Sequence, residues 1–320
     1  MFRTSFDIQE SKTKINLQDP IVLMGSCFSE NIGTLLSSNK FNTLTNPYGI
    51  IYNPISINKL LIHSIENSFV DYHLFGNRDD IHFHYDLHSD LSTLSKDDLK
   101  KRIDEKITES SDFIKKSKWL IITWGTSIVY ELKSQNQIVA NCHKIPSNQF
   151  NKRLLTHEEI VLNFNDFLKL IPSNTQIILA ISPVRHIKET IELNNVSKSI
   201  LRIASHNLSV QHENVHYFPS FEIMMDDLRD YRFYKKDMIH PNEQAIEYIW
   251  DKFGSTFFDS SVLDFVKQWQ KIQSALMHKA FQPTSNKHQD FLKKTLAKLI
   301  QLREVVNVDK EIEVLKSQMI

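Results

Sequence analysis

Continuous apolar runs of strand length recur along the chain and constrain its fold more than any other feature. They cover residues 21–24, 119–123 and 176–182, with a shorter run at 215–218. Segments in which apolar residues follow helical spacing separate these runs. Strands that are apolar throughout and alternate with helices are typical of a parallel sheet buried on both faces. The sequence therefore predicts an α/β fold, a three-layer α/β/α sandwich around a mostly parallel sheet.

The helical segments indicate a main domain and an extension. Helices are expected near residues 30–37, 57–65, 97–116, 156–170, 188–212 and 241–253, with a further strand near 81–85. Beyond residue 258 apolar residues recur only at helical spacing. We therefore expect residues 1–258 to form the α/β domain and residues 259–320 a helical extension broken near Pro283. The extension is predicted to pack on the main domain or on a partner subunit in a homo-oligomer.

Composition narrows the class of protein. The 320 residues are 41% hydrophobic and carry no net charge, so bulk charge favours neither nucleic acid nor an anionic membrane as a partner. Two cysteines give no disulfide framework. No apolar run reaches the length of a membrane span, and the N-terminal segment has no signal-peptide core. A cytoplasmic protein without nucleic acid, membrane or cofactor is expected.

The first apolar run ends on Gly25, and Ser26 and Cys27 follow at once before a helical segment. With six glycines in 320 residues, this chain uses glycine sparingly, so Gly25 indicates a backbone that needs it. The run places a hydroxyl and a thiol at the carboxyl end of a strand, where open α/β sheets bind ligands. The alternative is that these small residues only form a tight turn.

A second informative segment is Asp237-Met238-Ile239-His240-Pro241. Proline favours the first turn of a helix, so His240 is expected at a helix entrance. An aspartate three residues earlier can reach Nδ1 of the imidazole and leave Nε2 free as a general base. Alternatively, Asp237 only caps the helix and His240 packs beside it.

The segment GSCFSENIG at 25–33 resembles the signature of the GSCFA-domain family of bacterial proteins. The resemblance continues through TWGTSIVYE (123–131), NCHKIP (141–146), SPVRH (182–186), YFPSFEI (217–223), LRDYRFY (228–234) and DMIHPN (237–242). That family is grouped with the SGNH/GDSL hydrolases, which act on acyl esters through a serine nucleophile and a D-x-x-H pair. The resemblance implies a flavodoxin-like fold and acyl-transfer chemistry.

The resemblance also implies roles for individual residues. The hydrolase motif G-D-S-x-[ST]-E lies over residues 25–30, which puts Cys27 at the nucleophile position and Ser26 where the motif has aspartate. A register shifted by one residue makes Ser26 the nucleophile; we favour Cys27, because a thiolate needs less activation than a hydroxyl. A degenerate site, with Cys27 as a small buried residue, is the third possibility. Asp237 and His240 match the acid–base pair.

The expected oxyanion donors depart from the hydrolase pattern. Gly49 resembles the glycine donor, and Ser127 stands where the hydrolases have asparagine. A serine hydroxyl can donate a hydrogen bond, but from a shorter arm. Because loss of an oxyanion donor is costly, this substitution motivates an alternative, a non-catalytic ligand-binding protein on the same scaffold.

Other polar residues are candidates for substrate contact: His84, His88, His143 and Arg185. His82, His84 and His88 also suggest a metal-dependent hydrolase as an alternative, although no carboxylate and cysteine complete an evident zinc site and no metal is expected. The leading hypothesis is a hydrolase or acyltransferase, esterase-like, acting on an acyl ester or thioester of a small molecule or carbohydrate through Cys27 or Ser26, His240 and Asp237.

Overall fold

The computed structural model describes residues 4–68 and 70–320, so the first three residues of the predicted domain lie outside it. Its central sheet has the strand order β10-β9-β5-β1-β2, and every neighbouring pair is parallel. The strands are β1 (Ile21–Gly25), β2 (Thr43–Thr45), β5 (Trp119–Trp124), β9 (Gln176–Ile181) and β10 (Val215–Phe218). This is the flavodoxin-like order, and the predicted α/β class is confirmed.

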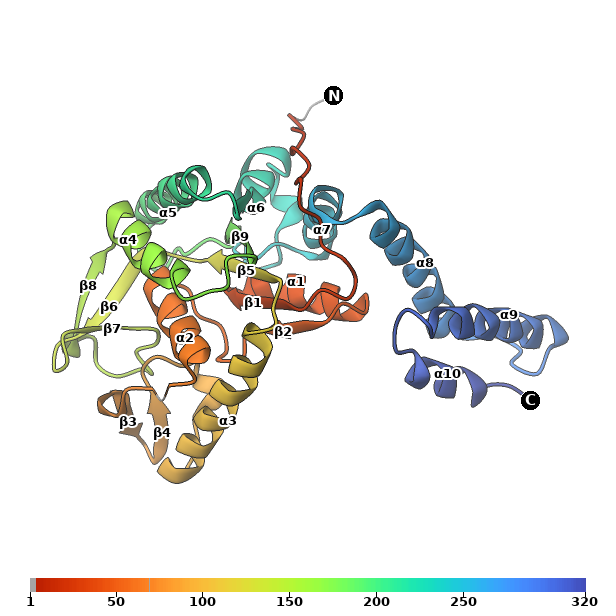
Figure 1. Cartoon of the computed structure of the whole chain (residues 1–320), viewed down its shortest axis with the longest axis horizontal. Helices are drawn as coiled ribbons and strands as arrows, with labels where there is room; N and C mark the ends of the chain where they lie inside the picture. Colours follow the sequence, from red (N-terminus) through yellow and green to blue (C-terminus); the bar gives the residue numbers. More distant parts are fainter. Residues whose placement is uncertain (1–3, 69) are drawn as a thin grey trace.

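Helices cover both faces of the sheet (Figure 1). The side chains of β1 alternate between two cores: Ile21 and Leu23 belong to one, and Val22 and Met24 to the other. The first core includes residues of α1 (Cys27–Ser38) and α7 (Glu243–Phe257); the second includes residues of α2 (Pro54–Glu66), α3 (Lys96–Ile114), α4 (His157–Leu168) and α5 (Ile191–Gln211). Strands apolar on both sides therefore form the middle layer of a sandwich.

Two helix starts differ from expectation because side chains cap them. Ser26 is the N-cap of α1, so the helix begins at Cys27, three residues earlier than predicted. Asn242 is the N-cap of α7 and accepts from the N–H of Ala245, so Pro241 precedes the helix instead of opening it. The predicted capping box of Thr156 and Glu159 is present at the start of α4.

A smaller antiparallel part extends the domain. The hairpin of β3 (Phe75–Arg78) and β4 (Ile81–His84) and the sheet of β6 (Ile128–Leu132), β7 (Gln137–Val139) and β8 (Phe150–Leu154) share a third apolar core. The strands β6 to β8 were not predicted from the sequence. Short helical turns complete this domain: η1 (Tyr72–Leu74), η2 (Ser89–Leu91), η3 (Ser147–Gln149), α6 (Ser220–Glu222), η4 (Ile223–Asp227) and η5 (Tyr231–Phe233).

Three helices follow the α/β domain: α8 (Ser260–Met277), α9 (Asn286–Leu302) and α10 (Asp309–Lys316). They lie to one side of the sheet, and α9 and α10 pack against each other (Figure 1). Trp269 donates from Nε1 to the carbonyl of Ser38 at 2.7 Å, and Lys40 pairs with Glu311 at 2.6 Å. These contacts attach the extension to the carboxyl end of α1, the opposite end from Cys27.

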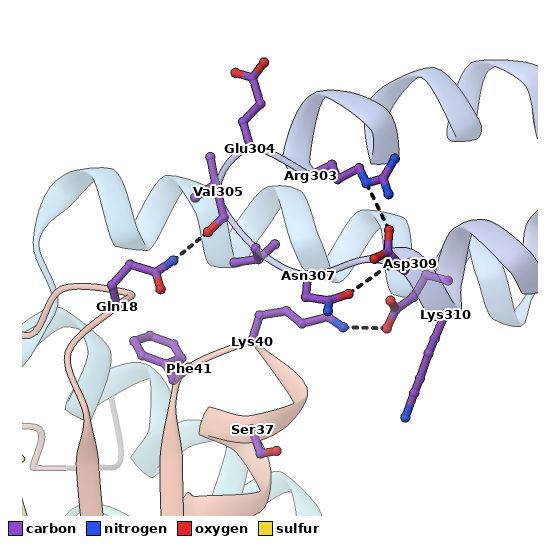
Figure 2. Close-up of a pocket in the computed structure, with 12 residues that line it drawn as sticks. Gln18, Ser37, Lys40, Phe41, Arg303, Glu304, Val305, Asn307, Asp309 and Lys310 are labelled. Atoms are coloured by element: carbon purple, nitrogen blue, oxygen red, sulfur yellow. Dashed lines mark hydrogen bonds and ion pairs between the residues drawn. The ribbon is translucent and has the colours of Figure 1, made fainter. Parts of the chain in front are cut away.

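Figure 2 shows the pocket that this junction encloses, with a volume of about 810 Å³. Gln18 of the main domain contacts Val305 in the loop that joins α9 and α10, and Lys40 contacts Glu311 of α10. Within the described residues, every helix is too short or too polar to cross a membrane.

Candidate active site

The end of β1 places Ser26 and Cys27 at the carboxyl edge of the sheet, beside β5. Gly25 pairs with Thr123 of β5, and the N–H of Ser26 donates to the Thr123 carbonyl at 3.1 Å. A Cβ on Gly25 would lie 2.1 Å from that carbonyl oxygen, and its φ is +139°. Glycine is therefore required, because the two strands approach too closely for a side chain. The strand order reverses between β1 and β5, which is where sheets of this kind bind ligands.

The two candidate nucleophiles lie in different environments. The Ser26 side chain is fully buried, and its Oγ accepts the N–H of Phe28 at 3.3 Å. Cys27 is half-buried in the first turn of α1. Burial raises the pKa of the Cys27 thiol, while its own backbone N–H, Lys198 and Lys235 lower it. The thiol is thus protonated near neutral pH and needs a base to ionise.

Asp237 and His240 form the contact expected from their spacing. Asp237 Oδ2 lies 2.7 Å from His240 Nδ1, and Asp237 Oδ1 accepts the backbone N–H groups of Ile239 and His240 at 2.9 and 3.0 Å. These backbone bonds and the imidazole lower the pKa of Asp237 to about 2. An ionised Asp237 assigns the proton to Nδ1 and leaves Nε2 as an acceptor.

Arg185 supports the loop that carries this pair. Its guanidinium lies 4.2 Å from the ring centre of Tyr234, and its backbone N–H and Nη1 donate to the carbonyls of Ile239 and Met238 at 3.4 and 3.5 Å. Arg185 was expected to contact substrate. The structure instead directs its donors to the loop, because the segment after β9 lies against it.

Three further residues interact with Cys27 or His240: Tyr52, His186 and Lys198. The ring centres of Tyr52 and His186 are 5.2 Å apart, and His186 Nε2 is buried without a hydrogen-bond partner in the described residues. Burial lowers the pKa of His186 to about 3, with contributions from Lys198 and His240. Burial raises the pKa of Tyr52, and Cys27 adds to this. Tyr52 interacts with Cys27 and His186 with His240, so the contact between the two rings connects the predicted nucleophile with the predicted base.

Gly125, just after β5, makes this arrangement possible. A Cβ there would lie 2.9 Å from Tyr52 Cδ1 and 3.2 Å from His186 Nε2. Its carbonyl and that of Ser182 accept hydrogen bonds from Lys198 Nζ at 2.8 and 2.7 Å. A fully buried lysine side-chain nitrogen is therefore held between the ends of β5 and β9.

No hydrogen bond joins His240 to Cys27 or Ser26 in residues 4–68 and 70–320. In ligand-free sites such bonds are often long and shorten only when substrate binds. The choice between the nucleophiles thus rests on exposure and hydrogen bonding instead of on contact with His240.

The expected oxyanion donors are engaged elsewhere. The N–H of Gly49 donates to the Asn46 carbonyl at 2.8 Å, within the turn after β2. Ser127 is fully buried, and its Oγ donates to Ser197 Oγ on α5 at 3.2 Å. A local turn uses the Gly49 donor and the packing of α5 uses the Ser127 donor, so these contacts do not support the two oxyanion assignments, which stay predictions.

The histidines expected at the cleft are also placed differently. His84 is buried: its Nε2 lies 2.9 Å from the Asp71 carbonyl, and its Nδ1 accepts the Asp86 N–H at 3.2 Å. His143 stacks on Phe83 at 4.2 Å, and its Nε2 lies 2.9 Å from the His84 carbonyl. These two side chains belong to the antiparallel part, where their ring nitrogens contact backbone groups, and substrate contact by either residue stays a prediction.

His88 caps the short turn η2, with Nδ1 3.4 Å from the Asp90 N–H and 3.1 Å from the Asp90 carboxylate. His82 lies beside Asn77, 3.4 Å from its amide nitrogen. Across the described ranges, no three His, Cys, Asp or Glu side chains are grouped so that they could hold a metal ion. His82, His84 and His88 are thus not grouped as a set of metal ligands, so the metal-dependent alternative loses the residues on which it rested.

Comparison with known families supports the sequence resemblance. A sequence model described as the GSCFA family matches residues 20–253, which is more than half of the chain. The chain belongs to the GSCFA family. A second model, the C-terminal domain of GSCFA domain proteins, matches residues 269–320 and so covers most of α8 to α10. The GSCFA match includes Cys27, His186, Lys198 and the Asp237–His240 pair.

A search of curated proteins returned no match. Among solved structures, this GSCFA protein is similar to a protein of Bacteroides fragilis described as a "putative acylhydrolase". The two are 10% identical, with a TM-score of 0.39, over 78% of this chain and 92% of that one.

Proposed function

We propose that this GSCFA protein is a hydrolase or acyltransferase that acts on an acyl ester or thioester, with Cys27 as nucleophile and His240 as general base. The observation that carries the proposal is the 2.7 Å contact between Asp237 Oδ2 and His240 Nδ1. It leaves Nε2 of a half-exposed imidazole free to accept a proton, at the same edge of the sheet as Cys27.

Cys27 is favoured over Ser26 because of hydrogen bonding. Ser26 Oγ is buried and already accepts the N–H of Phe28, so it serves as the cap of α1. Cys27 is partly exposed at the N-terminus of the same helix, where backbone N–H groups and the helix dipole stabilise a thiolate. Substrate would approach Cys27 from the solvent side of the first turn.

The reaction would proceed in two steps. Cys27 Sγ attacks the acyl carbonyl as its proton moves to His240 Nε2, and His240 returns that proton to the departing alcohol or thiol. Water or an acceptor hydroxyl then gives its proton to His240 and attacks the acyl-cysteine; the C–S bond breaks, and His240 returns the proton to the departing Cys27 thiolate. Asp237 holds the imidazole throughout and stays ionised, because the pKa of its carboxyl is lowered to about 2.

Intact-mass spectrometry of the full-length protein tests this proposal. Incubation with p-nitrophenyl esters and acyl thioesters of several chain lengths should add one acyl group, which peptide mapping should place on Cys27. His240→Ala should slow its formation, whereas Cys142→Ser should form it at the wild-type rate. Product formation without any dependence on Cys27 or Ser26 would contradict the proposal.

A second candidate is a binding protein that holds an acyl ligand without cleaving it. It is favoured by the donors of Gly49 and Ser127, which are engaged inside the protein and do not supply an oxyanion site. In this case the same esters would raise the melting temperature without an adduct or product, and His240→Ala would not change the measured affinity.

A further inference from the structure

A buried lysine stands out in the molecule. Lys198 is 2% exposed, and in the described part of the chain no carboxylate lies within ion-pair distance of its ammonium group. Two of its protons are donated to the carbonyls of Gly125 and Ser182. Burying a charge is costly unless it is paired, and burial lowers the pKa of Lys198 to about 7, so a nearby anion would stabilise its ammonium form.

The surroundings of Lys198 identify Cys27 as the source of that anion. The Gly125 carbonyl lies two residues beyond Thr123, whose carbonyl accepts the N–H of Ser26. Lys198 interacts electrostatically with Cys27, and each residue favours the charged form of the other. No carboxylate contributes to the electrostatic environment of Lys198.

The other charged and titratable groups around the pair are few. Tyr52 faces Cys27 from the segment before α2, and Lys235 faces it from the loop ahead of His240. His186 faces Lys198, and the ring of Phe221 lies 5.8 Å from its Nζ. Lys235 is exposed, so solvent and salt screen its effect, whereas Lys198 is shielded from both.

We propose that Lys198 is a positioning residue for the nucleophile: its ammonium group is the buried counter-cation that favours ionisation of the Cys27 thiol. The thiol proton passes to His240, and Lys198 keeps its own protons on the two strand-end carbonyls. The inference deepens the proposed function and rests on Cys27 as the nucleophile. It concerns ionisation alone, so it can fail while acyl transfer is upheld.

Alkylation of Cys27 by iodoacetamide as a function of pH tests this role without a substrate. In a Cys142→Ser background, Lys198→Met should raise the apparent pKa of Cys27 by about one unit and slow labelling at pH 7.5 about tenfold. Lys198→Arg should retain most of the reactivity. Lys198→Gln, which keeps a donor but no charge, should behave like Lys198→Met.

Lys235→Met is the matched comparison for an exposed lysine. Its smaller effect should disappear in 1 M salt, whereas the effect of Lys198→Met should persist. If Lys198→Gln labels with the wild-type pH profile, hydrogen bonding alone explains the lysine and the proposal is overturned.

A reciprocal measurement leaves Lys198 intact, in case its replacement prevents folding. Electrostatic coupling acts equally in both directions, so a permanent anion at residue 27 must raise the pKa of Lys198. Carbon-13 NMR of the lysine Cε should show a higher pKa in Cys27→Asp than in the isosteric Cys27→Asn. Equal values in the two variants would refute the pairing.

Discussion

Two regions of this protein are rich in histidine, and the hydrogen bonding of the imidazole rings differs between them. In the antiparallel part, His84 and His143 are buried, and the ring of each bonds to backbone groups. At the carboxyl edge of the central sheet, His186 Nε2 is buried without a hydrogen-bond partner among residues 4–68 and 70–320, and Asp237 contacts His240 through Nδ1. The first region uses histidine to complete its hydrogen bonds, while the second leaves acceptors available.

The difference shows which histidines can do chemistry. Burial lowers the pKa of His84 and of His143 to about 4, so both rings are neutral, but their nitrogens are engaged in the fold. A general base needs a nitrogen that can accept a proton and return it to substrate. His240 meets this condition because Asp237 binds the opposite nitrogen, so function follows from free acceptors instead of from the number of histidines.

The largest predicted effect tests this comparison directly, by replacing the proposed nucleophile in one region and a histidine in the other. Cys27→Ala should reduce turnover of an acyl substrate by at least about 10³-fold, because the covalent step is lost. His143→Asn, which tolerates the positive φ there, should lower the melting temperature and leave turnover nearly unchanged. The reverse pattern in steady-state kinetics would move the site to the antiparallel part.

The next largest effect concerns His240 and its orientation by Asp237. His240→Ala should lower kcat/KM by about 10²–10⁴-fold, the usual contribution of a general base. Asp237→Asn should lower it less, since the imidazole remains but its tautomer is no longer assigned. Circular dichroism of each variant is the control for folding. Equal activity of wild type and His240→Ala with a responsive substrate would remove His240 from the mechanism.

Lowering the pH should reduce the stability of the protein through His84 in the antiparallel part. Because the folded pKa of His84 is about 4 and that of an unfolded histidine about 6.5, the unfolded chain binds more protons between these values. The free energy of unfolding should therefore fall as pH decreases through this window, with His84 contributing about 2 kcal/mol between pH 7 and pH 5. Urea unfolding at the two pH values should show a smaller difference in His84→Gln.

The smallest predicted effect distinguishes the role of Ser26 as a helix cap from a role as nucleophile. Ser26→Ala should destabilise the protein by about 1 kcal/mol, the usual cost of a lost N-cap, and leave acylation of Cys27 close to the wild-type rate. Thermal unfolding and the mass-spectrometric adduct assay measure the two quantities on one sample. If Ser26→Ala abolishes the adduct and Cys27→Ala does not, Ser26 is the nucleophile.

Local patterns made the central sheet and its helices predictable. The strands that were apolar throughout lie in the middle layer, and the expected capping box at Thr156 is present. The contact between Asp237 and His240 was also predictable, since it spans three residues within one loop. The strands β6 to β8 were missed because they are short and only partly apolar.

The residues around Cys27 could not be assigned from the chain alone. One signal was available: Lys198 lies on the buried stripe of α5, among Asn194, Ser197, Leu201 and Ala204. A lysine on such a stripe indicates a buried charge, but the helical pattern does not determine which strand ends the side chain contacts. The contact of Ser127 with Ser197 could not be predicted for the same reason, because only the fold brings the two residues together, whereas the Gly49 donor bonds to Asn46 within a local turn.

By itself, the sequence determined the sandwich class, the strand end that carries Ser26 and Cys27, and the contact of Asp237 with His240, since each follows from periodicity or short-range spacing. The tertiary structure decided the strand order, the cap role of Ser26 and the meeting of Tyr52, His186 and Lys198 around Cys27. These come from separate segments that parallel strands deliver to one edge, so no local pattern encodes their proximity.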